Sequence, residues 1–234
     1  MPGSRNVPVA SRKQPKQARS TELVSAVLEA AVQVLSEQGA TRFTTARVAE
    51  KAGVSVGSLY QYFPNKAAIL FRLQSEEWHR TTTLLRGILE DAAMSPPERL
   101  RRLVHAFVSS ECDEAAMRGA LDDAAPLYRD APEARVAKAA GEGIMEAFLA
   151  EALPGVSEKR RKLAADLITA TLSDVGKRFS EASRLPSEIA TFTDAMSNMF
   201  QAYLDRLRSQ DELEPQSAPA KLYAMPLESR QPEG

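Results

Sequence analysis

The serine at position 55 lies in a sequence pattern that nucleophilic catalysis uses. Gly53-Val54-Ser55-Val56-Gly57 fits G-x-S-x-G, in which a sharp turn between a strand and a helix exposes a reactive serine. That chemistry needs a preceding strand, an upstream oxyanion-hole segment, and an acid and a histidine later in the chain. The residues before Ser55, TTARVAEKA, have helical periodicity instead. A serine hydrolase built on this segment is therefore a disfavoured alternative, and no residue is predicted to be catalytic.

The other side chains with reactive or metal-binding chemistry give no site. The only histidines, His79 and His105, lie in long helical patterns without metal-ligand spacing, and the single cysteine, Cys112, has no partner for redox chemistry. Neither a metal nor a cofactor is predicted. The chain also lacks an apolar run of membrane-spanning length and the apolar core of a signal peptide, so a cytoplasmic protein without membrane contact is expected.

The stretch around Ser55 also fits the turn and first residues of a helix that reads DNA. Charge along the chain favours this interpretation, because residues 1–75 carry ten Lys or Arg and four Glu, a net charge of +6. Residues 76–234 have a net charge of −7. A basic segment attracts a polyanion and an acidic one repels it, so we expect two separate tasks, although a chance distribution over solvated faces stays open.

Capping residues predict a three-helix unit at the N-terminal end, followed by a long fourth helix. Apolar residues between 23 and 35 recur at three- and four-residue steps, which predicts a helix that Gly39 ends. Thr44, Ser55 and Asn65 are good N-caps for the next three helices, and Gly53 supplies the turn of a helix-turn-helix motif. The predicted helices span 21–38, 45–52, 56–62 and 67–91.

Proline and glycine divide the remaining chain into further helices. Ser95-Pro96-Pro97-Glu98 opens one helix, and Pro154-Gly155 ends another. Two long helices are expected over 157–183 and 187–209. Strand-like two-residue alternation of Val, Ile, Tyr and Phe is hard to find, so the predicted fold class is all-α.

Residues 44–70 carry a specific resemblance. The pattern T-x-x-x-V-A-x-x-A-G-V-S-x-G-S-L-Y-x-Y-F-x-N-K-x-x-x-L resembles the signature of the TetR family of bacterial transcriptional regulators. The resemblance implies an N-terminal helix-turn-helix domain, a larger C-terminal helical ligand-binding and dimerisation domain, and a ligand-responsive repressor that binds a palindromic operator as a homodimer. The predicted divisions are a flexible basic arm (1–19), the DNA-binding domain (20–66), the ligand-binding and dimerisation domain (67–210) and a disordered tail (211–234).

Each predicted DNA contact combines the family resemblance with a physical reason. Small Gly57 and Ser58 let the third helix approach the major groove, and the side chains of Tyr60 and Gln61 can both donate and accept hydrogen bonds. Tyr62 and Lys66 resemble the phosphate-binding residues of the family. The arm either reaches the DNA through Arg19 or serves as a solubilising tail. The full set is Arg19, Thr44, Thr45, Ser55, Gly57, Ser58, Tyr60, Gln61, Tyr62 and Lys66.

Predicted ligand and dimer contacts rest on the resemblance and on helical periodicity. Asp174 shares a helical stripe with Leu163 and Leu167, where a carboxylate needs a partner. The predicted effector is small and mainly apolar or aromatic, because the candidate pocket positions carry few charges. Those positions are Trp78, His105, Phe107, Met117, Tyr128 and Asp174, for each of which ordinary core packing is the alternative. The predicted dimer face is Ile189, Phe192, Met196, Met199, Phe200 and Tyr203.

A helical interaction module is the remaining alternative. Such a protein would bind nucleic acid or membrane through its basic third, with no sequence preference and no dimer symmetry.

Overall fold

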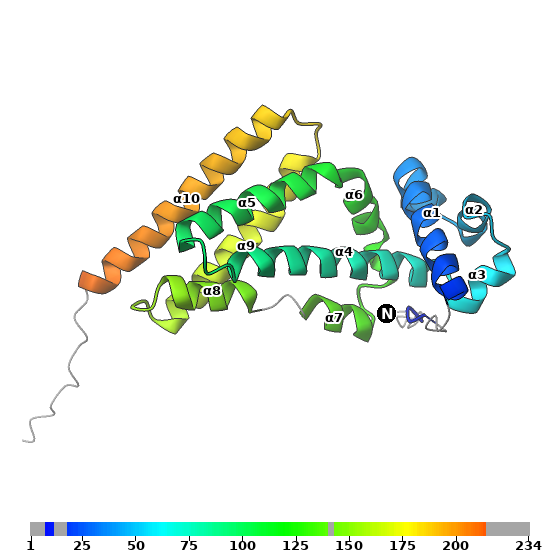
Figure 1. Cartoon of the computed structure of the whole chain (residues 1–234), viewed down its shortest axis with the longest axis horizontal. Helices are drawn as coiled ribbons and strands as arrows, with labels where there is room; N and C mark the ends of the chain where they lie inside the picture. The colour runs from blue at the N-terminus through cyan, green and yellow to red at the C-terminus, as the bar shows by residue number, and fades with distance from the viewer. Residues whose placement is uncertain (1–7, 12–17, 140–142, 214–234) are drawn as a thin grey trace, which may run out of the picture.

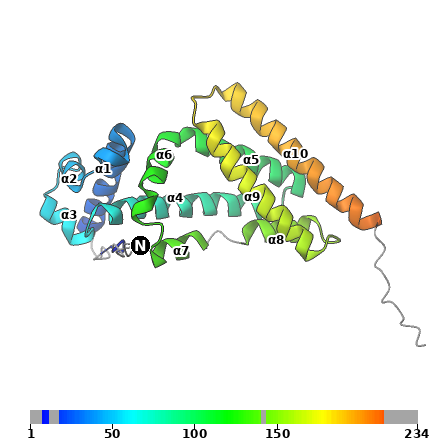
Figure 2. The ribbon, with the colours of Figure 1, turned by 180° about the vertical axis from the view of Figure 1, so that it is seen from behind.

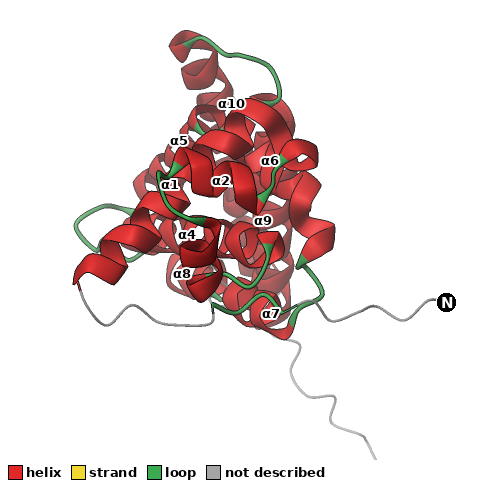
Figure 3. Ribbon diagram, turned by 90° about the vertical axis from the view of Figure 1, so that its right-hand side faces the viewer, coloured by secondary structure: helices red, strands yellow, loops and turns green. Residues whose placement is uncertain are grey.

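The computed structural model describes residues 8–11, 18–139 and 143–213, and every regular element in these ranges is a helix (Figures 1 and 3). The all-α prediction is confirmed, whereas the expected tail from residue 214 onward lies outside the described residues. The elements are α1 (Ala18–Arg42), α2 (Thr45–Lys51), α3 (Val56–Tyr62), α4 (Lys66–Leu89), α5 (Pro96–Asp113), α6 (Ala115–Ala124), the 3₁₀ turn η1 (Ala125–Leu127), α7 (Pro132–Ala139), α8 (Ile144–Ala152), α9 (Glu158–Ser180) and α10 (Pro186–Leu213).

Helices α2, α3 and α4 begin where their capping residues predict, whereas α1 runs past the expected end at Gly39 to Arg42, with a kink at that glycine. Oγ1 of Thr44 accepts a hydrogen bond from the Arg47 N–H at 3.3 Å, and Oγ of Ser55 accepts one from the Ser58 N–H at 3.0 Å. Oδ1 of Asn65 caps α4 in the same way at 2.9 Å. Gly53 has φ of +66°, a conformation that glycine adopts without the steric cost of a side chain. These local interactions fix the short α2-turn-α3 unit.

A buried arginine near the start of α5 contacts the end of α4 and the end of α8. Arg99, at the start of α5, is 2% exposed and donates a hydrogen bond to the Leu89 carbonyl at the end of α4 at 2.6 Å. It also pairs with Glu151 of α8 and lies 5.4 Å from the ring centroid of Phe148. A cation at the C-terminus of a helix satisfies its free carbonyls, so Arg99 fixes the far end of α4 against the body.

The molecule has two apolar cores, and α4 connects them along the long axis of the molecule (Figure 1). The first core combines α1 to α3 with the first two turns of α4 and with residues of α6 and α7. The second core joins the end of α4 to α5, α8, α9 and α10. Ala120 and Leu121 of α6 belong to the first core, where α6 packs directly on α1. Both α4 and α6 therefore connect the N-terminal helices to the larger helical body.

Part of the expected flexible arm is packed against the N-terminal helices. Val9 is 2% exposed and belongs to the first core, and the Pro8 carbonyl accepts a hydrogen bond from Nδ2 of Asn65 at 2.9 Å. Apolar burial and this hydrogen bond explain why residues 8–11 depart from the prediction for 1–19. Residues 1–7 and 12–17 lie outside the described ranges.

The apolar face of α10, which periodicity predicts to be a dimer face, packs largely within the chain. Met196 and Phe200 are 5% and 3% exposed because α5 covers them, and Phe192 stacks on Phe179 of α9 with ring centroids 3.9 Å apart. Ile189 and Tyr203 are half-buried against the second core. Of the six predicted residues only Met199 is exposed, at 52%.

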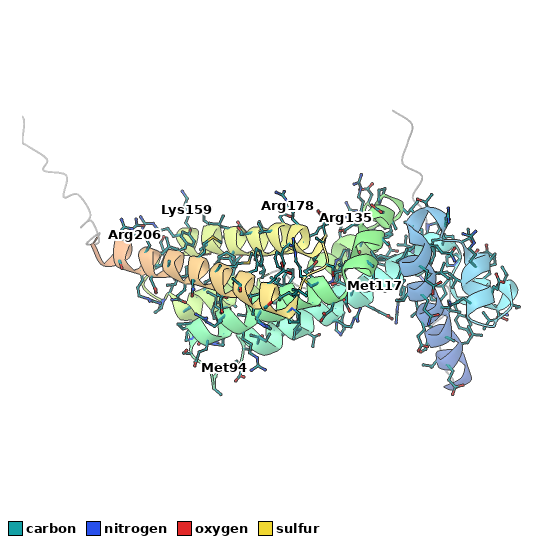
Figure 4. The ribbon with its side chains drawn as sticks, turned by 90° about the horizontal axis from the view of Figure 1, so that it is seen from above. Met94, Met117, Arg135, Lys159, Arg178 and Arg206 are labelled. Atoms are coloured by element: carbon teal, nitrogen blue, oxygen red, sulfur yellow. The ribbon has the colours of Figure 1, made fainter. Side chains whose placement is uncertain are left out.

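Three exposed apolar side chains lie on helix α9. Leu163, Leu167 and Val175 are 63%, 49% and 40% exposed. Figure 2 shows α9 open to the viewer, and in Figure 4 Lys159 and Arg178 of the same helix point away from the body. We use the name α9–α10 face for the exposed apolar side chains Leu163, Leu167 and Val175 of α9 and Met199 of α10.

Candidate nucleic-acid interface and effector cavity

Buried side chains anchor the helix-turn-helix unit and leave its other face free. Val48 and Ala49 of α2 and Leu59 of α3 are at most 1% exposed, and Phe63 closes the end of α3. The Val54 N–H bonds to the Ala49 carbonyl at 3.0 Å across the turn. This packing holds the two short helices in a fixed relative orientation.

The free face carries most of the predicted DNA contacts. Tyr60 is 39% exposed, and its hydroxyl lies 3.1 Å from Oγ1 of Thr45, so the two side chains form one polar pair across α2 and α3. Thr45 and Ser58 are half-buried, and Tyr62 is half-buried against the first core. The side chain of Arg19 lies outside the described part of the chain. The fully exposed members of the predicted set are Thr44, Ser55, Gly57, Gln61 and Lys66.

One further side chain on this face was missed by the sequence analysis. Val56, the first residue of α3, is 39% exposed beside Gly57. An exposed apolar side chain there can contact the methyl group of thymine. Its only sequence signal is its place directly after the capping serine.

Ser55 has the geometry of a capping residue. Its Oγ accepts the Ser58 N–H at 3.0 Å and lies 2.8 Å from the Ser58 hydroxyl. The element before it is helix α2, whereas a nucleophile elbow follows a strand. The hydrolase alternative is therefore not supported.

A cavity of about 480 Å³ opens between α4, α5, α6 and α9. Helix α4 contributes one wall, α5 and α6 line the interior, and α9 borders the opening. Trp78 and Phe107 provide aromatic surface, and Tyr128 donates its hydroxyl to the Leu121 carbonyl at 2.9 Å. The lining residues are Gln74, Glu77, Trp78, Thr81, Leu85, Phe107, Glu111, Arg118, Asp122, Ala125, Tyr128, Arg129, Ser173, Asp174 and Lys177.

Arg118 of α6 is the centre of a buried polar network in this cavity. Its Nη1 lies 2.8 Å from a carboxylate oxygen of Glu77 and 2.6 Å from one of Glu111, and its Nη2 lies 3.2 Å from Glu114. Nη2 also donates to Oγ of Ser110 at 2.9 Å. Glu77 and Glu111 are only 4% and 7% exposed. We call Arg118, Glu77, Glu111 and Glu114 the Arg118 cluster.

Burial changes the acidity of two groups on the cavity wall. Desolvation raises the pKa of Glu111 against the lowering effect of Arg118, and the neighbouring carboxylates of Glu77, Asp122 and Glu114 raise it further. Desolvation also raises the pKa of the Tyr128 hydroxyl, so it is a neutral hydrogen-bond donor at physiological pH. Lys177 pairs with Asp122 at 2.5 Å between α9 and α6.

The structure brings four of the six predicted ligand residues together and separates the other two. Trp78, Phe107 and Tyr128 line the cavity, and Asp174 lies at its exposed rim. His105 is exposed in a different groove between α5 and α10. Met117 packs on the first core, at the junction with the N-terminal helices (Figure 4). His105 and Met117 therefore do not face the cavity.

The cavity is more polar than the sequence analysis expected. Seven charged side chains line it, so the argument for a mainly apolar effector from a scarcity of charge is wrong. The sequence held a usable signal, because Gln74, Glu77 and Thr81 interrupt the apolar stripe of α4, and Glu111 continues that of α5. A polar residue at a core position of a helix requires a partner, which periodicity alone does not identify.

Two family models match the chain in the order that the fold displays. One described as "Bacterial regulatory proteins, tetR family" matches residues 27–73, and one described as "Tetracyclin repressor-like, C-terminal domain" matches residues 95–207. The chain belongs to the tetR family. The tetR family is a family of bacterial regulatory proteins.

Individual relatives of this tetR-family chain are more distant. It is 36% identical over 84 residues to the nucleoid occlusion factor SlmA of Vibrio campbellii, covering 36% of this chain and 42% of that protein. The chain thus matches less than half the length of this curated relative.

Solved structures share the fold over nearly their whole length. The fatty acid degradation regulator FadR from Bacillus halodurans is 21% identical with a TM-score of 0.60, covering 83% of this chain and 99% of that one. FadR from Bacillus subtilis in complex with stearoyl-CoA is 18% identical with a TM-score of 0.57, covering 75% of this chain and 96% of that one.

In the described ranges, no helix is long and apolar enough to cross a membrane.

Proposed function

We propose that this regulator represses transcription as a homodimer on an inverted-repeat operator and releases DNA when a small molecule occupies the cavity between α4, α5, α6 and α9. The observation that carries this proposal is the shared position of α4 and α6, which line the cavity and also pack in the first core. A ligand bound between these helices can therefore change the position of the DNA-binding helices.

DNA is read by the free face of α3. Gln61 and Val56 contact base edges, because an amide can donate and accept hydrogen bonds and an apolar side chain can contact the thymine methyl. The Thr45–Tyr60 pair and Lys66 contact phosphates, with Lys66 at the first turn of α4, where free backbone N–H groups add positive potential. Phosphate contacts position the helix, and base contacts give sequence preference.

A second copy of the chain covers the α9–α10 face. Leu163, Leu167 and Met199 are each about half exposed or more in the single chain, and burying such side chains is favourable. A two-fold dimer presents two α3 helices to half-sites about one DNA turn apart. The protein works in the cytoplasm, where it meets bacterial DNA.

The experiment that tests this function is selection of bound sequences from a random DNA library by the purified full chain. An inverted repeat with half-sites about one helical turn apart is the expected result. Gln61→Ala should change the preferred bases, whereas Lys66→Ala should weaken binding to all sequences alike. Enrichment without two-fold symmetry would contradict the dimeric mode, and no enrichment would contradict operator binding itself.

A further inference from the structure

The Arg118 cluster carries more negative than positive charge in a nearly buried place. One guanidinium faces the carboxylates of Glu77, Glu111 and Glu114, and among the described residues the only other cation paired with them is Arg80, which lies 3.1 Å from Glu114. The side chain of Arg80 is 59% exposed, so solvent screens its charge. A buried carboxylate without full compensation favours a neighbouring positive charge.

The two buried carboxylates differ in how completely they are paired. Glu77 forms an ion pair with Arg118 and receives hydrogen bonds from the Thr81 hydroxyl at 2.8 Å and from Gln74 Nε2 at 3.0 Å. Glu111 receives one, from Arg118 at 2.6 Å. Both line the cavity together with Trp78 and Phe107. Glu111 is therefore the group that can accept a further donor without losing its present one.

An anionic ligand would meet a guanidinium that is already engaged. Arg118 uses Nε, Nη1 and Nη2 in contacts with three carboxylates and two hydroxyl groups. Displacing a carboxylate from Arg118 would leave that carboxylate buried and unpaired, which is costly. The aromatic rings of Trp78 and Phe107 add a surface that attracts a cation.

We propose that the effector is an organic cation with an apolar or aromatic body, whose positive charge is received by Glu111 and Glu77 in competition with Arg118. This inference rests on the proposed function and specifies the ligand class and the regulation of the same cavity. Trp78 and Phe107 contact the body of the ligand.

Competition for Glu77 and Glu111 changes the position of α6. Arg118 holds α6 to α4 through Glu77 and to α5 through Glu111, and α6 packs on α1. When the ligand cation takes these carboxylates, Arg118 loses both of these ion pairs and keeps, with these two helices, only hydrogen bonds to the neutral Thr81 of α4 and Ser110 of α5, so α6 is held less tightly and can shift with α1. A shift of α1 moves the helix-turn-helix unit that packs on it.

The binding test uses a cation, a neutral probe of the same shape and an anion of different structure. Benzyltrimethylammonium, its neutral isostere neopentylbenzene and the anion stearoyl-CoA are titrated into the full chain by calorimetry. We expect the cation to bind at least about tenfold more tightly than the isostere, because the carboxylates and the aromatic rings attract its positive charge. Glu111→Gln should remove that difference, whereas His105→Ala, outside the cavity, should retain it.

The outcomes of this test and of DNA selection distinguish the cation proposal from the proposed regulatory function. Equal binding of cation and isostere, tighter binding of stearoyl-CoA, no binding of the cation, or an unchanged preference in Glu111→Gln would overturn the cation proposal. DNA selection without any ligand is measured separately. A selected operator together with a failed cation preference would refute the ligand class alone, and failure of DNA selection would refute the regulatory function.

The coupling step has its own readout. Hydrogen exchange of the backbone amides is measured with and without benzyltrimethylammonium on the wild type and on Arg118→Lys, which keeps the charge but cannot bridge both carboxylates in the same way. Bound cation should speed exchange in α6 and in the facing turns of α1 and should weaken operator binding in the wild type. Unchanged exchange in α6 with weakened operator binding would overturn the route through α6.

Discussion

Lys66 is exposed and lies in the first turn of α4. Lys66→Ala should weaken binding to all DNA sequences and lower the slope of log affinity against log salt by about one unit, as expected for one lost phosphate contact. Lys162→Ala, an exposed lysine on α9, should leave the slope unchanged. A slope that is equal in wild type and Lys66→Ala would remove Lys66 from the backbone contacts. The measurement is a salt titration of operator affinity.

Glu111 makes the stability of the protein depend on pH. Its pKa is raised above the ordinary value of 4.5, chiefly by desolvation, in surroundings formed by Glu77, Arg118 and Asp122 with Glu114 and Lys177 nearby. The folded chain therefore holds this proton to higher pH than the unfolded chain does. The resulting stability is complete below the ordinary value and is lost as pH rises through the raised folded pKa.

Urea unfolding at a series of pH values measures this effect. The free energy of unfolding should fall over that window in the wild type, and Glu111→Gln should reduce the slope. Asp113→Asn, at an exposed position nearby, should retain it. Equal slopes in wild type and Glu111→Gln would assign the pH dependence to other groups.

At the scale of elements, Gly57 tests how closely α3 approaches DNA. A Cβ at position 57 would meet only Oγ of Ser55, at 3.7 Å, so Gly57→Leu should fold normally. A leucine there should hold α3 away from the groove floor and reduce operator affinity by at least about 100-fold, through loss of several base contacts of ~1–3 kcal/mol each. Gly87→Leu on α4, where nothing lies within 4 Å of the added Cβ, is the control for helix composition. Operator binding retained in Gly57→Leu would mean that α3 does not enter the groove.

The N-terminal segment should stabilise the DNA-binding unit without touching DNA. Val9→Ser removes a nearly fully buried side chain and should cost about 1–3 kcal/mol of unfolding free energy, whereas Ala10→Ser, at an exposed position, should cost little. Asn65→Ser keeps a capping oxygen for α4 but loses the amide that binds the Pro8 carbonyl. Denaturant unfolding of the three variants is the measurement, and equal stability of Val9→Ser and Ala10→Ser would contradict the packing of this segment.

Helix positions were predictable from local sequence, and contacts between helices were not. Thr44, Ser55 and Asn65 identify helix starts because capping involves residues only three positions apart. The pairing of Arg118 with Glu77 joins residues on different helices, and no spacing rule predicts it. The same limitation applies to the predicted dimer face, since periodicity shows that one side of α10 is apolar but does not show that α5 packs on it.

The whole molecule should assemble through the α9–α10 face. Leu167→Glu would bury an unpaired charge in each half of a two-fold interface and should raise the dimer dissociation constant by at least about 100-fold. Val136→Glu is the matched control, because Val136 is an equally apolar residue that is 73% exposed on α7. Sedimentation velocity over a range of concentrations gives the measurement. A Leu167→Glu protein that sediments as the wild type does would exclude this face from the dimer.

Trp78 is the only tryptophan of the chain, and its indole lines the cavity from α4. Because this indole is the only one in the chain, the tryptophan fluorescence of the unmodified protein reports on the cavity. A molecule that enters the cavity should shift or quench the emission, so binding can be followed without a label. Helix α3, which we propose to read the operator, lies beside the N-terminal end of α4 (Figure 1), whereas Trp78 lies in the middle of α4. A change in emission upon adding DNA alone would therefore show that α4 transmits movement between the two ends of the molecule.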